Sequence, residues 1–166
     1  MKGTHTVVVE RAKVKYTLTF KRNISFIRGN SGTGKTTLIA ALVGALKDLN
    51  IKPILLAPTG RAAKVLAQYA QEKAFTIHKR IYRQRTNADY ESKYSLNFNA
   101  EKGAVFIVDE ASMLSDSPGG GALFGSGSLL EDLVQYVRSG RDCRLVLVGD
   151  SAQLPPVGAD RSPALD

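Results

Sequence analysis

The chain has 166 residues, of which 43% are hydrophobic, and it contains one cysteine, Cys143, and two histidines. This length allows one domain with its own buried core, and the composition excludes a disordered chain. An intrachain disulfide is excluded by the single cysteine, and a structural zinc site is not expected from so few ligands. No apolar run approaches the roughly 20 residues of a membrane helix, and the first residues lack the apolar part of a signal peptide. We therefore expect a cytoplasmic protein without membrane contact.

The formal net charge is +8. Lysine and arginine neutralise phosphates and release counterions, so a basic balance favours a polyanionic partner such as nucleic acid. A basic, solvated surface without such a partner gives the same net charge.

The first third of the chain alternates between strand and helix patterns. Residues 6–9 and 14–20 have strand character, the second segment with a period of two, and they predict an N-terminal strand pair over residues 6–20. Residues 24–27 predict a third strand that runs directly into a glycine-rich loop. Helical spacing follows over residues 36–49, and residues 54–57 predict a short buried strand.

The remaining elements continue the alternation. Helices are predicted over residues 60–72, 76–82 and 128–138, the last with Ser128 as its cap, and buried strands over 104–108 and 144–148. Between them, residues 83–103 are polar, with an alternating piece at 94–98 that residues 99–103 could turn over into a hairpin. Strands that alternate with helices predict an α/β fold with a parallel β-sheet and helices on both faces.

The most specific motif is the segment 29–36, which fits G-x-x-x-x-G-K-T between a predicted strand and a predicted helix. In such a P-loop the backbone N–H groups surround phosphate oxygens, Lys35 reaches the β- and γ-phosphates, and the Thr36 hydroxyl binds Mg²⁺. A glycine turn before an ordinary lysine is the alternative, and the strand–loop–helix context disfavours it. The predicted ATP-binding residues are Gly29, Asn30, Ser31, Gly32, Thr33, Gly34, Lys35, Thr36 and Thr37.

Two acids, Asp109 and Glu110, follow the apolar run 104–108. In P-loop enzymes an acid at that point holds Mg²⁺, and a neighbouring acid can activate the attacking water. We assign Asp109 to the metal, together with Thr36, and Glu110 to the base; a pair of helix-capping acids is the alternative. Gln153 follows the last predicted strand and could contact the γ-phosphate or the attacking water, although a proline-rich surface turn fits that segment too.

Candidate nucleic-acid contacts follow the strand at 54–57. A small hydroxyl, a glycine and an arginine at a helix start suit a phosphate backbone, and the next segment offers further donors. A capped helix and a satisfied core histidine explain the same residues equally well. The residues concerned are Pro58, Thr59, Gly60, Arg61, Thr76 and His78.

Together these motifs resemble the first RecA-like motor domain of a superfamily 1 DNA helicase of the RecD-like kind, which translocates 5′ to 3′. They occur in the family's order over residues 24–158. The matching segments are the Walker A loop 29–36, 56–63 (similar to motif Ia), 76–78, 109–113 (similar to Walker B) and 149–158 (similar to motif III).

The resemblance implies a RecA-like P-loop fold, ATP and Mg²⁺ as cofactors, single-stranded DNA as partner, and work in DNA repair and recombination. Lys35, Glu110 and Gln153 would be catalytic, with Gln153 sensing the γ-phosphate and coupling it to DNA. Residues 83–103 stand where such helicases carry a strand-separating hairpin, and a surface hairpin without a role fits the same pattern.

The chain also departs from that family. It ends just after motif III, so the second motor domain and its arginine finger are missing, and lack of such an arginine can cost about 10³–10⁵ in rate. The glutamine motif that reads adenine is not visible upstream. We therefore expect residues 1–166 to form a single domain, a fragment that binds ATP–Mg²⁺ and, weakly, DNA but hydrolyses little ATP and unwinds nothing. A standalone ATPase switch that takes its arginine from a partner subunit is the alternative, and a nucleic-acid-binding protein with an inactive ATP site is a third.

Overall fold

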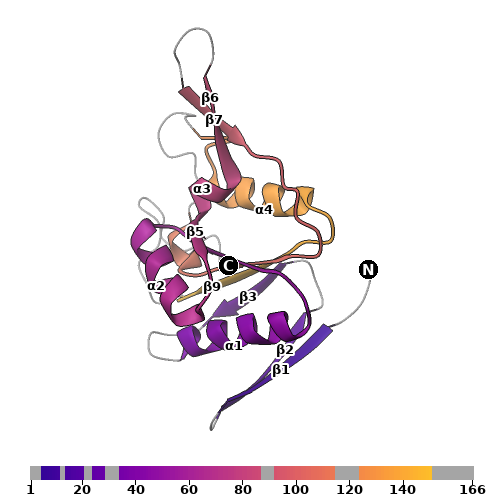
Figure 1. Cartoon of the computed structure of the whole chain (residues 1–166). Helices are drawn as coiled ribbons and strands as arrows, with labels where there is room; N and C mark the ends of the chain where they lie inside the picture. The colour runs from indigo at the N-terminus through magenta and orange to yellow at the C-terminus, as the bar shows by residue number, and fades with distance from the viewer. Residues whose placement is uncertain are drawn as a thin grey trace.

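A computed structural model of the chain describes residues 5–11, 14–20, 24–28, 34–86, 92–114 and 124–150. Its centre is a five-stranded, fully parallel sheet (Figure 1) in the order β3-β9-β8-β4-β5. The predicted parallel α/β fold is therefore confirmed. The strands are β3 (Ile24–Arg28), β4 (Pro53–Ala57), β5 (Ala74–Thr76), β8 (Val105–Val108) and β9 (Arg144–Gly149).

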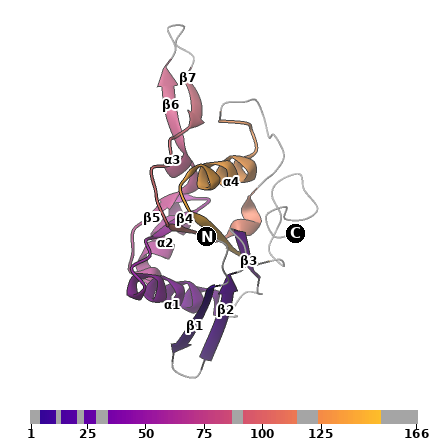
Figure 2. The same ribbon diagram turned by 90° about the vertical axis from the view of Figure 1, so that its right-hand side faces the viewer.

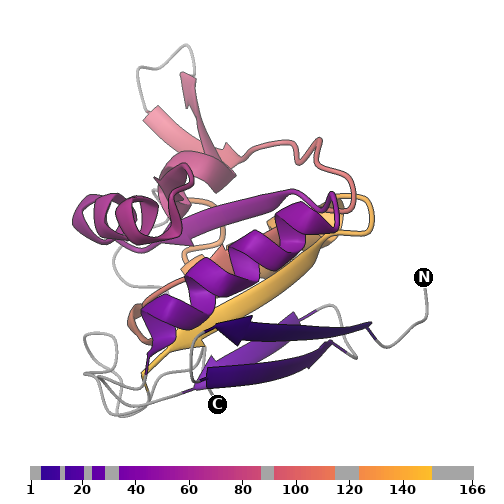
Figure 3. The same ribbon diagram turned by 60° about the horizontal axis from the view of Figure 1, so that its bottom comes forward.

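Helices cover both faces of this sheet, as the sequence predicted. Figure 3 shows α1 lying along one face, and Figure 1 shows α3 and α4 beyond the opposite face. Successive side chains of a strand point to opposite faces, which is why uninterrupted apolar runs form these strands. On β9, Leu145 and Leu147 pack in the cluster with α4, whereas Val146 and Val148 pack in the cluster with α1. The helices are α1 (Lys35–Asp48), α2 (Gly60–Ala70), α3 (Ile77–Ile81), the 3₁₀ helix η1 (Ala111–Met113) and α4 (Leu129–Ser139).

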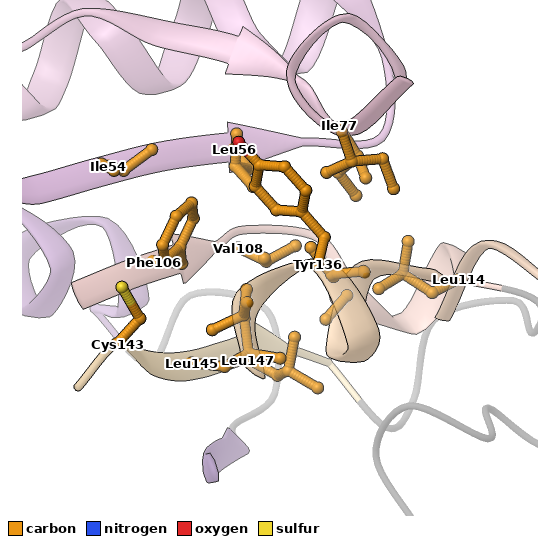
Figure 4. Close-up of a cluster of buried hydrophobic side chains, with 14 of the residues drawn as sticks. Ile54, Leu56, Ile77, Phe106, Val108, Leu114, Tyr136, Cys143, Leu145 and Leu147 are labelled. Carbon is orange, nitrogen blue, oxygen red and sulfur yellow. The ribbon is translucent and has the colours of Figure 1, made fainter. Parts of the chain in front are cut away.

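The larger cluster of buried side chains lies between the sheet and α3 and α4. Figure 4 shows Phe106 on β8, with Ile54 on β4 on one side of it and Leu145 on β9 on the other. The ring of Tyr136, from α4, meets the Phe106 ring edge-on with centroids 6.0 Å apart. Aromatic pairs favour this T-shaped geometry, so the cluster fixes α4 against the sheet that carries the candidate site.

The N-terminal strands form a separate antiparallel pair. β1 (His5–Arg11) pairs with β2 (Val14–Phe20) in the register His5↔Phe20, and this pair is not hydrogen-bonded to the central sheet. Figure 2 shows the pair beside α1, at the end of the molecule opposite to the hairpin described next.

A second hairpin is inserted between α3 and β8. β6 (Tyr82–Thr86) pairs antiparallel with β7 (Ser92–Leu96), and the hairpin projects away from the sheet (Figure 2). A hairpin within 83–103 was predicted, but the prediction that residues 99–103 turn the alternating strand over was wrong. β7 pairs with the strand before it, and the segment after β7 returns to the sheet, where Lys102 forms a bridge with Arg141.

The base of the hairpin is held by a buried carboxylate. Asp132 on α4 has only 1% of its surface exposed, and its Oδ2 accepts a hydrogen bond of 2.6 Å from the Tyr82 hydroxyl. The same oxygen accepts the Ser126 backbone N–H at 3.0 Å. The Phe124 ring stacks on Tyr94 of β7 at 4.5 Å. Because a buried charge is tolerated only when it is hydrogen-bonded, these contacts fix the segment 124–128 against the hairpin.

Gly125→Ala should destabilise the protein by about 1–3 kcal/mol, the usual result of forcing a methyl group into a packed site. Gly125 has φ +45°, and an added Cβ would lie 2.0 Å from Asp132 Oδ2. The free energy of unfolding in urea measures the effect. Gly44→Ala in α1 is the matched control: nothing lies within 4 Å of its added Cβ, and it should stabilise by about 0.5–1 kcal/mol. Equal unfolding midpoints for the two variants would contradict this description of the hairpin base.

Candidate nucleotide-binding site

The candidate site lies where the parallel strands end, because the carboxyl ends of parallel strands share one edge of a sheet. Gly29–Thr33 lie outside the residues that the structure describes. Gly34 follows them with φ 80°, a left-handed conformation that glycine adopts without strain, and α1 begins at Lys35. Gly34 has no side chain that could cap the first N–H groups of α1, and the first turn carries no acid. Such a helix start favours an anion.

Lys35 forms an ion pair across this edge. Its Nζ lies 3.3 Å from Oδ2 of Asp150, the residue that follows β9, and the Asp150 side chain is only 2% exposed. β9 is the direct neighbour of β3 in the sheet, which brings the two residues together. The sequence indicated segment 149–158 but assigned no role to Asp150. The sequence pattern that indicated Asp109, an acid directly after a buried strand, is also present at Asp150 and could have identified it. Gln153 lies outside the described residues.

Asp109 and Glu110 stand at the end of β8, beside β9. The Asp109 backbone N–H donates to the Leu56 carbonyl at 3.0 Å, and Asp109 Oδ1 accepts the Glu110 N–H at 2.9 Å. Glu110 has φ 53°, which is uncommon for a residue with a side chain and is found most often at turns and functional sites. Burial, and then the neighbouring Asp109 charge, raise the pKa of Glu110 above its ordinary range. The two acids are therefore fixed in place and differ in their environments.

A further side chain reaches Asp109 from another element. Tyr69, near the end of α2, donates its hydroxyl hydrogen bond to Asp109 Oδ2. Burial, followed by this hydrogen bond, raises the pKa of Tyr69. The sequence predicted a helix over residues 60–72 but not this contact, because residues 40 positions apart meet only through the fold.

The donor set fits a magnesium ion. Mg²⁺ prefers oxygen ligands and is usually held by one or two carboxylates together with substrate phosphates. Asp109 offers a carboxylate oriented on both oxygens, and Thr36 is exposed in the first turn of α1. Over the described ranges, no group of three or more His, Cys, Asp or Glu side chains could hold a metal by itself. An ion here would therefore take phosphate oxygens as well.

The six candidate nucleic-acid contacts follow two neighbouring strands. β4 and β5 pair in parallel with Ala57 opposite Thr76, so the segments 58–61 and 76–78 start at the same sheet edge. Thr59 caps α2 by accepting the Ala62 N–H at 3.2 Å, and Thr76 caps α3 by accepting the Lys79 N–H at 3.2 Å. The capping role that was left open for these threonines is therefore present.

The other candidate contacts differ in exposure. Gly60 and Arg61 are exposed in the first turn of α2, and Pro58 is half-buried just before it. His78 is half-buried, with its ring 5.2 Å from Phe124 and 5.7 Å from Tyr82, and burial lowers its pKa. His78 thus packs on the aromatic base of the hairpin, while Arg61 is the charged group presented to solvent.

Comparisons with known proteins show which family this chain is similar to. The profile of the family described as AAA domain matches residues 10–164. The chain is 33% identical over 135 residues to the ATP-dependent RecD2 DNA helicase of Deinococcus radiodurans, covering 80% of this chain and 16% of that protein. It is 32% identical over 173 residues to the RecBCD enzyme subunit RecD of Haemophilus influenzae, covering 89% and 24%. The chain therefore spans a quarter or less of the length of these relatives.

A solved structure shares the fold. A crystal structure of Bacteroides Pif1 bound to ssDNA covers 82% of this chain and 30% of its own, with a TM-score of 0.50 and 24% sequence identity. Among the described helices, none combines the length and the apolar character that crossing a bilayer requires.

Proposed function

This chain belongs to the AAA-domain family, and on that premise we propose that it is the ATP-binding motor domain of an ATP-dependent DNA helicase that moves 5′ to 3′. Its predicted resemblance to RecD-like superfamily 1 helicases is confirmed by the relatives described above. The observation that supports the proposal is the Lys35–Asp150 ion pair at the end of β9, with the Asp109–Glu110 pair at the end of the neighbouring strand β8. We further propose that it works in the cytoplasm, in DNA repair or recombination.

The proposed chemistry is transfer of the γ-phosphoryl group of ATP to water. Lys35 binds the β- and γ-phosphates, and the first turn of α1 directs its N–H groups at them. Asp109 and Thr36 hold Mg²⁺, which neutralises charge on the phosphates when bound. Glu110 accepts a proton as the water oxygen bonds to the γ-phosphorus and the bridging oxygen leaves with ADP. A raised pKa makes Glu110 a stronger base than an exposed glutamate.

The DNA part of the proposal rests on the start of α2. Arg61 is exposed one residue into a helix whose N-terminus favours an anion, and the strand before it ends at the same edge as the candidate ATP site. A single strand that passes there would contact Arg61 and the neighbouring backbone. This surface would combine with a second motor domain or partner subunits in the whole protein.

Arg61→Ala should weaken binding of a fluorescein-labelled oligodeoxythymidine, measured by fluorescence anisotropy at several salt concentrations. Loss of one phosphate contact should lower the slope of log Kd against log salt by roughly 0.7. Arg141→Ala is the matched control, because Arg141 is 74% exposed but precedes β9 at the opposite edge of the sheet. If both variants lose the same affinity, net charge alone explains binding and the α2 site is wrong.

A further inference from the structure

The carboxylate of Asp109 is held on both of its oxygens by donors from two different elements. Oδ1 accepts the backbone N–H of Glu110 at 2.9 Å, and Oδ2 accepts the hydroxyl of Tyr69. The first donor is local, since it belongs to the next residue. The second comes from α2, which packs on the sheet face that also carries α1. The orientation of this carboxylate is therefore set partly by a helix distant in sequence.

The Tyr69 hydroxyl is suited to donate rather than to accept. Its partner is a carboxylate oxygen, which offers lone pairs, and the phenol hydroxyl carries the hydrogen of the bond between them. An ionised carboxylate has about four lone-pair sites, so two donors leave sites for a cation.

We propose that Tyr69 is a positioning residue for the metal site: its hydroxyl fixes the Asp109 carboxylate in the orientation that binds Mg²⁺ together with ATP. This inference rests on the proposed function, which makes Asp109 a metal ligand. Without the hydroxyl, the carboxylate is held on one oxygen only and can rotate away from the ion. Loss of a hydrogen-bonding partner behind a metal ligand typically costs about 10–100-fold in metal affinity.

The test is Tyr69→Phe, which keeps the ring and removes only the hydroxyl. ATP binding is measured by isothermal titration calorimetry over a series of MgCl₂ concentrations and in EDTA. We expect Tyr69→Phe to need about tenfold more MgCl₂ than the wild type to reach half of the magnesium-dependent gain in ATP affinity. The ATP affinity measured in EDTA should be the same for both proteins. Binding of Mg²⁺ to ATP in solution is the same for every variant. A difference in magnesium requirement between wild type and variant therefore comes from the metal site of the protein.

The matched control is Tyr82→Phe. Tyr82 also donates its hydroxyl to a buried carboxylate, Asp132, at 2.6 Å, but at the base of the hairpin. It should therefore lose a similar amount of stability and keep the wild-type magnesium requirement. Asp109→Asn supplies a second reference: in that background Tyr69→Phe should have no further effect on the magnesium requirement, because the ligand it orients is gone.

The outcomes separate the inference from the function beneath it. If the wild type needs Mg²⁺ for tight ATP binding but Tyr69→Phe has an equal or lower requirement, the positioning role is overturned and the metal site stands. The positioning role also fails if Tyr82→Phe shifts the requirement as much, since general loosening would then explain both. If the wild type gains no affinity from Mg²⁺, the proposed metal site falls and the inference falls with it.

Discussion

Lys35→Ala should reduce ATP binding to below detection. Lys35 supplies the positive charge at the start of α1, and its Nζ already pairs with the buried Asp150 at 3.3 Å. In the proposed complex Lys35 also contacts the phosphates of ATP, and removal of one partner from a buried charged contact between two molecules costs about 2–5 kcal/mol, or roughly 30-fold and upwards in affinity. Calorimetric titration of ATP with MgCl₂ measures the effect, and circular dichroism checks that the variant is folded.

Lys47→Ala is the matched control for this experiment. Lys47 lies in the last turn of the same helix and pairs with Glu72, but at the surface, where its side chain is 46% exposed. Because exposed ion pairs contribute little, this variant should bind ATP like the wild type. Wild-type affinity in Lys35→Ala would show that the nucleotide does not bind at the start of α1.

Glu110→Gln should lower the rate of ATP hydrolysis by about 10²–10⁴, the usual contribution of a general base, while ATP affinity is kept. The amide fills the same space but cannot take the proton of the attacking water. Single-turnover phosphate release, with protein in excess over ATP, detects the slow hydrolysis expected of this chain. Glu131→Gln, at an exposed position in the first turn of α4, is the control and should leave the rate unchanged.

The pH dependence of ATP hydrolysis is a second test of Glu110 as the general base. A general base acts in its deprotonated form, so the wild-type rate should rise with pH as Glu110 loses its proton. Burial and the Asp109 charge raise the pKa of Glu110, so the rise should be centred above the pH at which an ordinary glutamate titrates. Glu110→Gln should lose this rise. A variant that hydrolyses ATP at the wild-type rate would exclude Glu110 as the base.

The sheet and the place of the site could be predicted because both depend on local patterns. The run at 104–108 is apolar at every position, and the run at 144–148 is apolar after Arg144, which is typical of strands covered on both faces; β8 and β9 are covered in this way. The polar residues that follow such strands must meet at one edge. Asp109 and Glu110 were found by that reasoning and Lys35 by the G-x-x-x-x-G-K-T motif, and the roles of all three stay predictions.

The elements missed by the sequence had no such pattern. β5 is three residues long, too short to show a period, and β6 contains one aromatic residue among polar ones. β6 is a strand because Tyr82 is buried against Asp132 and because β7 pairs with it, both tertiary effects. The turn expected at 99–103 was wrong for the same reason, since the pairing partner of β7 had not been recognised.

The contacts of Tyr69 and Asp150 at the site were not predicted either, because they too depend on the tertiary structure. Tyr69 is 40 residues from Asp109, and no local period indicates which hydroxyl of a helix will face a carboxylate. Thr59 and Thr76 show the opposite case, since the capping role follows from a threonine directly before a helix and is observed. Capping uses one lone pair of each threonine hydroxyl and leaves the hydroxyl hydrogen for another acceptor. The proposed contact of these threonines with DNA stays a prediction, and the binding measurement on Arg61 tests the surface at the start of α2.

The central claim is that this chain holds ATP at the edge formed by α1, β8 and β9. Titration of ATP into the wild-type chain, once with MgCl₂ and once with EDTA, tests it most directly. We predict saturable binding of one ATP per chain that is tighter with MgCl₂. Absence of saturable heat in both titrations, from a chain that circular dichroism shows to be folded, would contradict the claim.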